Sequence, residues 1–194
     1  MAPSPGDPCT THLRPGANDQ VAIQSALLEA AVGHVICLDE GTYRLSDGLS
    51  LGVPGVAVRA PFGRAVLDFS AQASDAPGLQ LLGDDVELQG VEIRNTAGDG
   101  IRIVGGDGVH LRGVRVGWGP EAPPVPGARG IAVEQATNVT MEAIRVRGAA
   151  GAGVSLDGSA GVSIDGISIA RGPEGISYGD SVDVAVRNER ILLP

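Results

Sequence analysis

The 194-residue sequence contains no lysine, few aromatic residues and two cysteines. All 14 basic residues are arginine, and the 23 acidic residues outnumber them, so the formal net charge is −9. This acidic balance argues against general binding of nucleic acid. No apolar run approaches the length of a membrane span. The sequence also shows no His/Cys metal cluster, no nucleophile triad and no phosphate-binding loop, so no standard motif points directly to an activity.

Aromatic residues make up 3% of the chain although hydrophobic residues reach 43%, so we expect a core of aliphatic side chains. The 30 glycines are typical of a chain with many tight turns. The length fits one domain, residues 1–194, that is large enough to bury a substantial core.

A short pattern of alternating apolar residues recurs five times between about Leu79 and Val186, and the fifth copy is incomplete. Each copy has two apolar phrases, of which Ile101–Val104 and Val109–Val116 are an example. The valines that open the second phrase are separated by 23, 30 and 23 residues; they are Val86, Val109, Val139 and Val162. A repeat with a period in the twenties indicates a solenoid.

The alternation of period two predicts strands rather than helices. Three short strands per repeat form one turn of a coil, in which inward Val, Ile and Leu side chains stack about 4.8 Å apart. We therefore predict an all-β fold, a single-stranded right-handed parallel β-helix (solenoid) with an N-terminal capping α-helix. The handedness follows from the general preference for right-handed connections. A leucine-rich repeat has a similar period, but its L-x-x-L-x-L frame and helical half are absent from this sequence.

The same alternation predicts which side chains point outward. The first sheet is expected to show Gln80, Arg102, Ala132, Ser155 and Ser177. The second sheet is expected to show Glu87, His110, Thr140, Ser163 and Asp183.

The front of the chain is expected to close one end of the coil. Residues 1–17 are rich in Pro, Gly and Thr and predict an extended arm. Residues 18–33 predict a cap helix that starts at Asn18 or Asp19 and ends at Gly33, with an apolar face that includes Val21 and Leu27. An open solenoid end needs such a cover. Residues 34–190 are then expected to form the rungs.

Cys9 and Cys37 lie on the arm and on the first strand, and we predict a disulfide between them. The alternative is two unrelated thiols. A bond would contribute roughly 3 to 4 kcal/mol in the chain-entropy model and would imply an oxidising compartment. Residues 1–6 look like a start methionine placed before a mature N-terminus, so we expect a secretion signal to have been cut away. The protein is then secreted, periplasmic or on the outer cell surface.

The 30-residue step contains an inserted proline-rich loop, residues 117–129, with the single tryptophan, Trp118. We predict that this loop stands off the coil. Loops on a rigid scaffold are frequent binding elements; a tolerated surface insertion is the alternative.

The phrase Gly-Ile-x-Ile, followed by Val-x-Leu-x-Gly-Val-x-Ile, resembles the repeat of the pectate-lyase-like right-handed parallel β-helix superfamily. This superfamily includes bacterial secreted β-helix proteins, polysaccharide lyases and mannuronan C5-epimerases. The segment from Asn18 to Tyr43 also looks like the cap helix and first rung of such proteins. The resemblance covers nearly the whole chain and implies the fold more strongly than any activity, because the repeat encodes the core.

In that superfamily the sugar groove lies along the first sheet, flanked by the turn after the third. The resemblance therefore implies that Arg94, Arg102, Arg147 and Trp118 converge on one substrate-binding side. Arginine forks suit the carboxylates of a uronate chain. Uronate chemistry also needs a base and an acid. His110 is placed on the second sheet, away from this groove, and is expected to be a surface histidine.

The candidate catalytic residues are Arg102, Arg147, Glu134 and Asp157. Glu134 and Asp157 are expected one turn apart at the end of the first sheet. Such a pair suits Ca²⁺ as a cofactor, or a glycoside hydrolase with two carboxylates. A solvated edge is the alternative.

These observations leave three functions open. The sequence predicts a protein that recognises an acidic polysaccharide and processes it as a lyase or epimerase, or recognises it alone. The second function is a non-catalytic structural or assembly protein, and the third is a glycoside hydrolase.

At the C-terminal rung, residues 191–193 either fold back or leave an open edge that pairs with a second copy as a homodimer.

Overall fold

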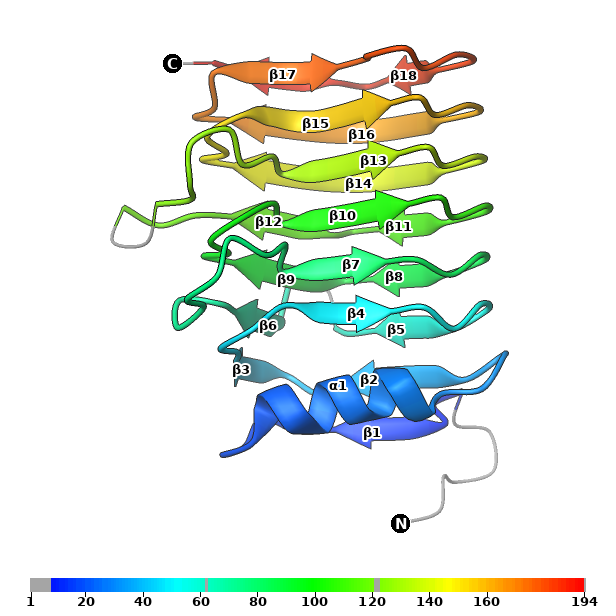
Figure 1. The fold of residues 1–194 in the computed structure, drawn as a ribbon, viewed down its shortest axis with the longest axis vertical. Coiled ribbons are helices and arrows are strands. Elements are labelled where there is room, and N and C mark those ends of the chain that lie inside the picture. The colour runs from blue at the N-terminus through cyan, green and yellow to red at the C-terminus, as the bar shows by residue number, and fades with distance from the viewer. Residues whose placement is uncertain (1–7, 62, 121–122, 194) are drawn as a thin grey trace.

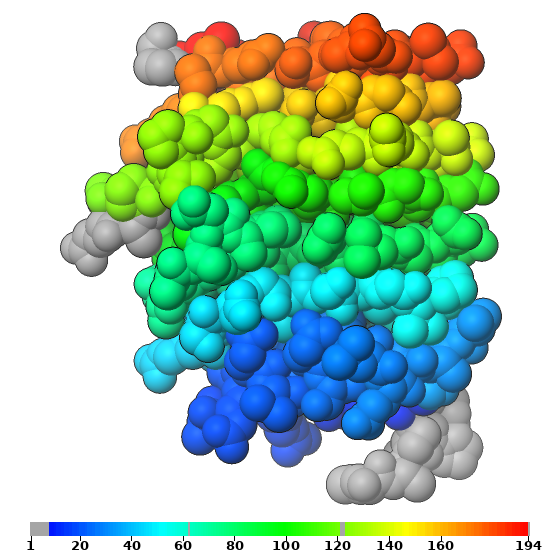
Figure 2. Space-filling model, in the orientation of Figure 1, coloured from blue at the N-terminus to red at the C-terminus, as the bar shows by residue number. Residues whose placement is uncertain are grey.

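The computed structural model describes residues 8–61, 63–120 and 123–193, and its chain winds into a parallel β-helix of about eight turns. Figure 1 shows these turns stacked along one axis, with helix α1 (Asp19–Glu29) at one end and the last strands at the other. In the space-filling view the turns form successive layers (Figure 2). This architecture confirms the predicted β-helix fold.

Each regular turn contributes one strand to each of three sheets. The first sheet contains β4 (Leu49–Leu51), β7 (Leu79–Leu81), β10 (Ile101–Val104), β13 (Ile131–Glu134), β15 (Ala152–Asp157) and β17 (Glu174–Ser177). The second contains β1 (Thr11–Leu13), β2 (Val35–Leu38), β5 (Ala57–Arg59), β8 (Glu87–Gln89), β11 (His110–Arg112), the first halves of β14 (Thr140–Arg147) and β16 (Ser163–Ala170), and β18 (Ala185–Arg187). The third contains β3 (Gly41–Arg44), β6 (Ala65–Asp68), β9 (Val91–Arg94), β12 (Arg115–Gly117), the second halves of β14 and β16, and β19 (Arg190–Leu192).

The strand register confirms that the residues of the predicted first-sheet column align, although Ala132 in this column is fully buried. Its members pair in register on successive strands; they are Gln80, Arg102, Ala132, Ser155 and Ser177. On the second sheet the position beside Ser163 is Ala185, not the predicted Asp183. Ser155 pairs with Ser177 and Ser163 pairs with Ala185, so the fifth turn repeats the register of the fourth, and its second phrase begins at Val184 rather than Val182.

Glycines at the start of the first-sheet strands leave room for side chains of the third sheet. A Cβ atom on Gly100 would lie 2.2 Å from Cγ1 of Val116, and one on Gly130 would lie 2.4 Å from Cγ1 of Val146. Both valines are buried. The glycine of the Gly-Ile-x-Ile phrase therefore lets the first and third strands of one turn pack closely across the interior.

Helix α1 lies beneath β4 (Figure 1) and is shorter than the predicted segment 18–33. Its Ile23 and Leu27 are buried, whereas Val21, expected on the same apolar face, is 66% exposed. The side-chain amide of Gln24 accepts from the backbone N–H of Ser50 at 3.0 Å and donates to its carbonyl at 3.1 Å. The helix thus provides hydrogen-bond partners for the backbone of Ser50, at the edge of the first sheet where another strand would pair. Among the described residues, no helix is long and apolar enough to cross a membrane.

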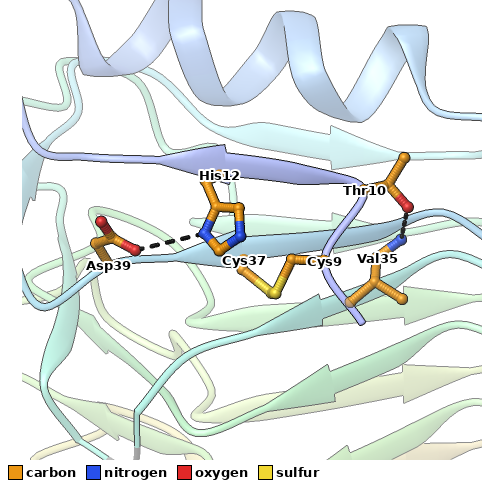
Figure 3. Close-up of a disulfide and its surroundings, with 6 residues drawn as sticks. All are labelled: Cys9, Thr10, His12, Val35, Cys37 and Asp39. Atoms are coloured by element: carbon orange, nitrogen blue, oxygen red, sulfur yellow. Dashed lines mark hydrogen bonds and ion pairs between the residues drawn. A yellow bond between two sulfur atoms is a disulfide. The ribbon is translucent and has the colours of Figure 1, made fainter. Parts of the chain in front are cut away.

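The predicted disulfide between Cys9 and Cys37 is confirmed, with the two Cα atoms 5.7 Å apart (Figure 3). The N-terminal segment is not only an arm, because β1 pairs with β2 and extends the second sheet. Nδ1 of His12, on β1, lies 3.7 Å from a carboxylate oxygen of Asp39. Residues 1–6, for which a removed secretion signal was predicted, lie outside the described part of the chain.

Candidate functional site

Four arginines and a tryptophan line a hollow of about 400 Å³ on the outer face of the third sheet. The arginines are Arg94, Arg115, Arg145 and Arg147, and the tryptophan is Trp118. One acid, Glu92, lines the same hollow. We call this feature the basic hollow.

Strand alternation places these arginines on one surface. Val116 and Val146 point inward and are buried, so their neighbours Arg115, Arg145 and Arg147 point outward. The parallel register sets Arg115 beside Arg145, and Gly117 beside Arg147. The repeat therefore builds a cationic surface on an otherwise acidic protein.

Glu92 neutralises only part of this charge. It accepts a hydrogen bond from Nε of Arg94, and its second oxygen lies 3.9 Å from Nη1 of Arg115. Arg145 and Arg147 are exposed, and within the described residues their guanidinium groups form neither a hydrogen bond nor an ion pair. Two charged groups are therefore free to bind a ligand at this surface.

The sequence predicted that the inserted loop, with Trp118, stands off the coil. For Trp118 this prediction is wrong, because its side chain lies against the coil. Its Nε1 donates to the carbonyl of Thr96 at 2.7 Å, and its backbone N–H donates to the carbonyl of Arg147 at 3.1 Å. The half-buried indole therefore forms a fixed wall of the basic hollow. The later part of loop 117–129 does project from the coil (Figure 1), and residues 121 and 122 lie outside the described chain.

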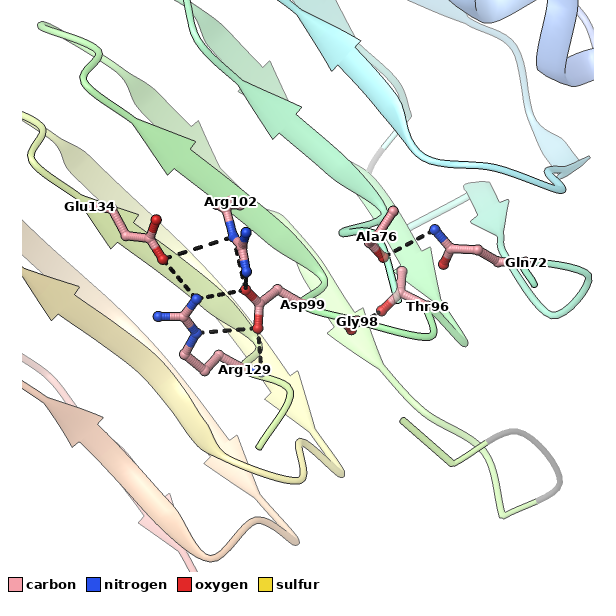
Figure 4. A network of polar contacts seen from close by, with 8 residues as sticks. All are labelled: Gln72, Ala76, Thr96, Gly98, Asp99, Arg102, Arg129 and Glu134. Atoms are coloured by element: carbon pink, nitrogen blue, oxygen red, sulfur yellow. Dashed lines mark hydrogen bonds and ion pairs between the residues drawn. The ribbon is translucent and has the colours of Figure 1, made fainter. Parts of the chain in front are cut away.

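Arg102 is not brought together with Arg94, Arg147 and Trp118. It lies on the first sheet and donates from Nη2 to a carboxylate oxygen of Asp99 at 2.7 Å. Arg129 donates to the same carboxylate from its backbone N–H at 2.7 Å and from Nη2 at 2.8 Å, and Nη2 also reaches Glu134 at 2.7 Å (Figure 4). The guanidinium of Arg102 is thus already bound within the protein.

Asp99 is the centre of this first-sheet network and is only 4% exposed. Burial alone would raise its pKa, but the hydrogen bonds from Arg129 and Arg102 outweigh burial and lower the pKa below its ordinary value. Neither Asp99 nor Arg129 was among the residues predicted from the sequence. The available signal was the Gly98-Asp99-Gly100 turn, which places a carboxylate where the chain enters the first sheet.

Glu134 and Asp157 are neighbours in the parallel register of β13 and β15, as expected from their spacing. Glu134 is held by Arg129, whereas Asp157 is exposed. Across the described ranges, no group of three or more His, Cys, Asp or Glu side chains is arranged to hold a metal ion. Calcium at this pair therefore stays a prediction.

A second hollow, of about 440 Å³, lies on the second sheet and has a different charge. Three acids line it, together with His110 and Arg112; they are Asp85, Glu87 and Glu142. His110 lies exposed on the second sheet, away from the basic hollow. The cationic character of the basic hollow is therefore not shared by the hollow on the second sheet.

Solved structures with very different functions share this architecture. A candidate glycosyl hydrolase from Parabacteroides merdae superposes with a TM-score of 0.72 at 15% identity, over 92% of this chain and 90% of the other. An alginate lyase from Paenibacillus sp. str. FPU-7 gives 0.59 at 18% identity, over 93% and 76%. PfbA, a surface adhesin of Streptococcus pneumoniae, gives 0.57 at 12% identity, over 89% and 58%. At such low identity the likeness shows the fold alone.

No curated protein matches the chain in sequence. Residues 77–192 do match the family model for the right-handed beta helix region, which covers more than half of the chain. The chain therefore belongs to the right-handed β-helix family.

Proposed function

We propose that this protein binds an acidic polysaccharide in the basic hollow of the third sheet. The observation that carries the proposal is the pair Arg145 and Arg147, two exposed guanidinium groups without partners among the described residues, on a chain with a net charge of −9. Planar guanidinium groups bind carboxylates through two parallel hydrogen bonds. A ligand with repeated carboxylates satisfies both arginines at once.

The remaining wall of the hollow suits a sugar. Trp118 has its indole N–H bound to Thr96, so the ring is fixed and presents apolar surface beside Arg147. Such a ring can pack against the apolar face of a pyranose while the arginines bind its charged groups. The low identity to the alginate lyase and the glycosyl hydrolase leaves the substrate open, but polysaccharide binding is compatible with both neighbours.

The geometry favours recognition over processing. Among the predicted catalytic residues, Arg102 is hydrogen-bonded to Asp99 and Glu134 to Arg129. The carboxylate that lines the basic hollow, Glu92, is paired with Arg94. None of these groups is poised to remove a C5 proton, so we propose recognition alone rather than a lyase or epimerase activity.

Secretion is part of the same proposal. A disulfide is typical of oxidising compartments, and polysaccharides of this kind are met outside the cytoplasm. The pairing of Cys9 with Cys37 supports this location.

Proton NMR of alginate and of polygalacturonate, with and without the protein and with and without calcium, tests the proposal. We expect broadened sugar lines without new signals, because bound chains tumble slowly. New unsaturated-uronate signals would establish a lyase, and altered C5 stereochemistry would establish an epimerase. Sharp, unchanged lines for both polymers would refute the binding of uronates.

A second candidate function is self-association through the turn formed by β17, β18 and β19. Several large apolar side chains of this turn and its flanks are about half exposed; they are Tyr178, Val182, Leu192 and Leu193. Strand edges of this kind pair readily with another copy. Light scattering over a range of concentrations should show a mass increase that Leu192→Asp suppresses, and a constant monomer mass would exclude the homodimer.

A further inference from the structure

The basic hollow continues into two further hollows on the same side of the protein. A hollow of about 380 Å³ lies at the corner between the second and third sheets and shares Arg115 and Arg145 with the basic hollow. A hollow of about 390 Å³ lies under the inserted loop and shares Trp118 and Arg147 with it. The three spaces therefore adjoin one another across the third sheet.

Each end of this series has its own arginine. Arg190 lines the corner hollow, and Arg171 lines the loop hollow. Both are exposed, and neither forms an ion pair or a side-chain hydrogen bond within the described chain. Among the described residues, six arginines thus line the series against the single acid Glu92; they are Arg94, Arg115, Arg145, Arg147, Arg171 and Arg190.

We infer that the three hollows are one continuous groove, and that its ligand is a linear uronate chain several sugars long that crosses the third sheet. This inference rests on the proposed function and adds to it the length and the path of the ligand. The chain meets Arg190 at the corner, Arg115 and Arg145 in the centre, and Arg147 and Arg171 beneath the loop. A single uronate or a short oligomer occupies only part of this path.

The prolines of the loop define the end of the path. Pro120, Pro123 and Pro124 line the loop hollow together with Trp118. Proline limits backbone freedom, so these three residues lose little conformational entropy when a ligand binds. The inserted segment therefore extends the groove beyond the edge of the third sheet.

Affinity for such a groove depends strongly on ligand length. Sites that bind linked units act together, so each newly occupied hollow multiplies the affinity. A charge-assisted hydrogen bond is worth about tenfold in the dissociation constant. We expect the affinity to rise steeply from the dimer to a length that spans all three hollows and then to level off.

Isothermal titration calorimetry with the galacturonate dimer, tetramer and octamer tests this inference on the full chain. Arg171→Ala and Arg190→Ala, at the two ends, should each cost the octamer at least fivefold more affinity than the dimer. Arg145→Ala, in the centre, should weaken all lengths by a similar factor. Arg112→Ala, on the second sheet, is the control and should leave every affinity within twofold.

The outcomes separate the two proposals. Dissociation constants that do not change with length would overturn the continuous groove but keep polysaccharide binding. Failure of every length, and of the polymer, would refute the proposed function itself. Single-stranded DNA of matched charge is the competitor; displacement of the octamer by it at equal concentration would show a general polyanion groove and would also overturn the inference.

Discussion

Arg115 of β12 lies directly beside Arg145 of β14 in the parallel register of the third sheet, so two guanidinium-bearing side chains are neighbours on adjacent strands. Like charges in this relationship destabilise a sheet. Glu92 lies 3.9 Å from Arg115, but Arg145 has no partner of this kind among the described residues. A sheet that keeps such a pair is well arranged to gain stability from a bound anion.

The first prediction follows from this repulsion. Arg145→Ser places at this position the residue that the next strand carries at the same register, Ser168. We expect the variant to be more stable without ligand, by a few tenths to about 1 kcal/mol, and to bind polysaccharide more weakly. Denaturant unfolding at low salt measures the effect.

Arg147→Ser is the matched control for that prediction, because its neighbours in register are Gly117 and Ala170, which carry no charge. Its stability should change little. Equal stability changes in the two variants, or a loss in Arg145→Ser, would show that the pair is not repulsive. High salt should reduce the difference, because exposed charges are screened.

The second prediction concerns Asp99. Its pKa is lower in the folded protein than in the unfolded chain, so the unfolded chain takes up the proton first as the pH falls. The stabilisation is therefore complete above about pH 4 and is lost progressively below it. Unfolding followed from pH 7 to pH 2 should show this loss.

Asp99→Asn should remove most of that acid dependence and should cost about 3 kcal/mol at neutral pH, because Arg102 and Arg129 lose their shared charged partner. Asp157→Asn, at an exposed acid that ends β15 of the first sheet, is the control and should change stability by less than about 0.5 kcal/mol. Similar losses in both variants would contradict a special role for the Asp99 network.

The third prediction concerns the alkaline limit. Burial, with the nearby charges of Asp39 and Asp19, raises the pKa of Tyr43 to about 12, and its hydroxyl donates to the carbonyl of Leu13 at 2.7 Å. The unfolded chain loses this proton near pH 10, so stability should fall by roughly 2 to 3 kcal/mol as the pH rises from 10 to 12.

Tyr43→Phe should be less stable by about 1 kcal/mol at neutral pH through the lost hydrogen bond, and its stability should be flatter between pH 10 and 12. Thermal unfolding in a pH series distinguishes the two proteins. An unchanged alkaline slope in the variant would assign that slope to other groups.

The fourth prediction concerns the glycines that precede the first-sheet strands and leave room for side chains of the third sheet. Gly130→Ala places a Cβ atom 2.4 Å from both Cγ1 of Val146 and the carbonyl oxygen of Gly153, so it should destabilise the fold by about 1 to 3 kcal/mol or more. Gly52→Ala is the control, because no atom lies within 4 Å of its added Cβ. Urea unfolding of both variants gives the comparison, and equal midpoints would refute close packing at Gly130.

The repeat was sufficient to predict the coil because a β-strand has only two faces. Once Ile101 and Ile103 are inward, Arg102 must be outward, and the stacking of successive turns sets it beside Gln80. The disulfide followed from two cysteines on segments that meet at one end. These features depend on local pattern and on stacking between adjacent turns.

The candidate site was less predictable because it depends on side-chain contacts between distant residues. Arg102 is bound by Asp99 three residues earlier, and the same carboxylate binds Arg129, thirty residues later. Trp118 reaches Thr96 across one turn of the coil. Residue spacing gives the face of a side chain but not its partner. The predicted grouping of Arg94, Arg147 and Trp118 therefore agrees with the basic hollow, whereas the predicted place of Arg102 beside them was wrong.

The measurement that tests the central claim most directly is calorimetric titration of polygalacturonate into three proteins. These are the unaltered chain, the double variant Arg145→Ala/Arg147→Ala, and the double variant Arg44→Ala/Arg112→Ala. The second pair removes the same charge from β3 and β11, outside the groove. We predict affinity at least tenfold weaker for the groove variant and within twofold for the control. Equal weakening in both, or none in either, would contradict binding in the basic hollow.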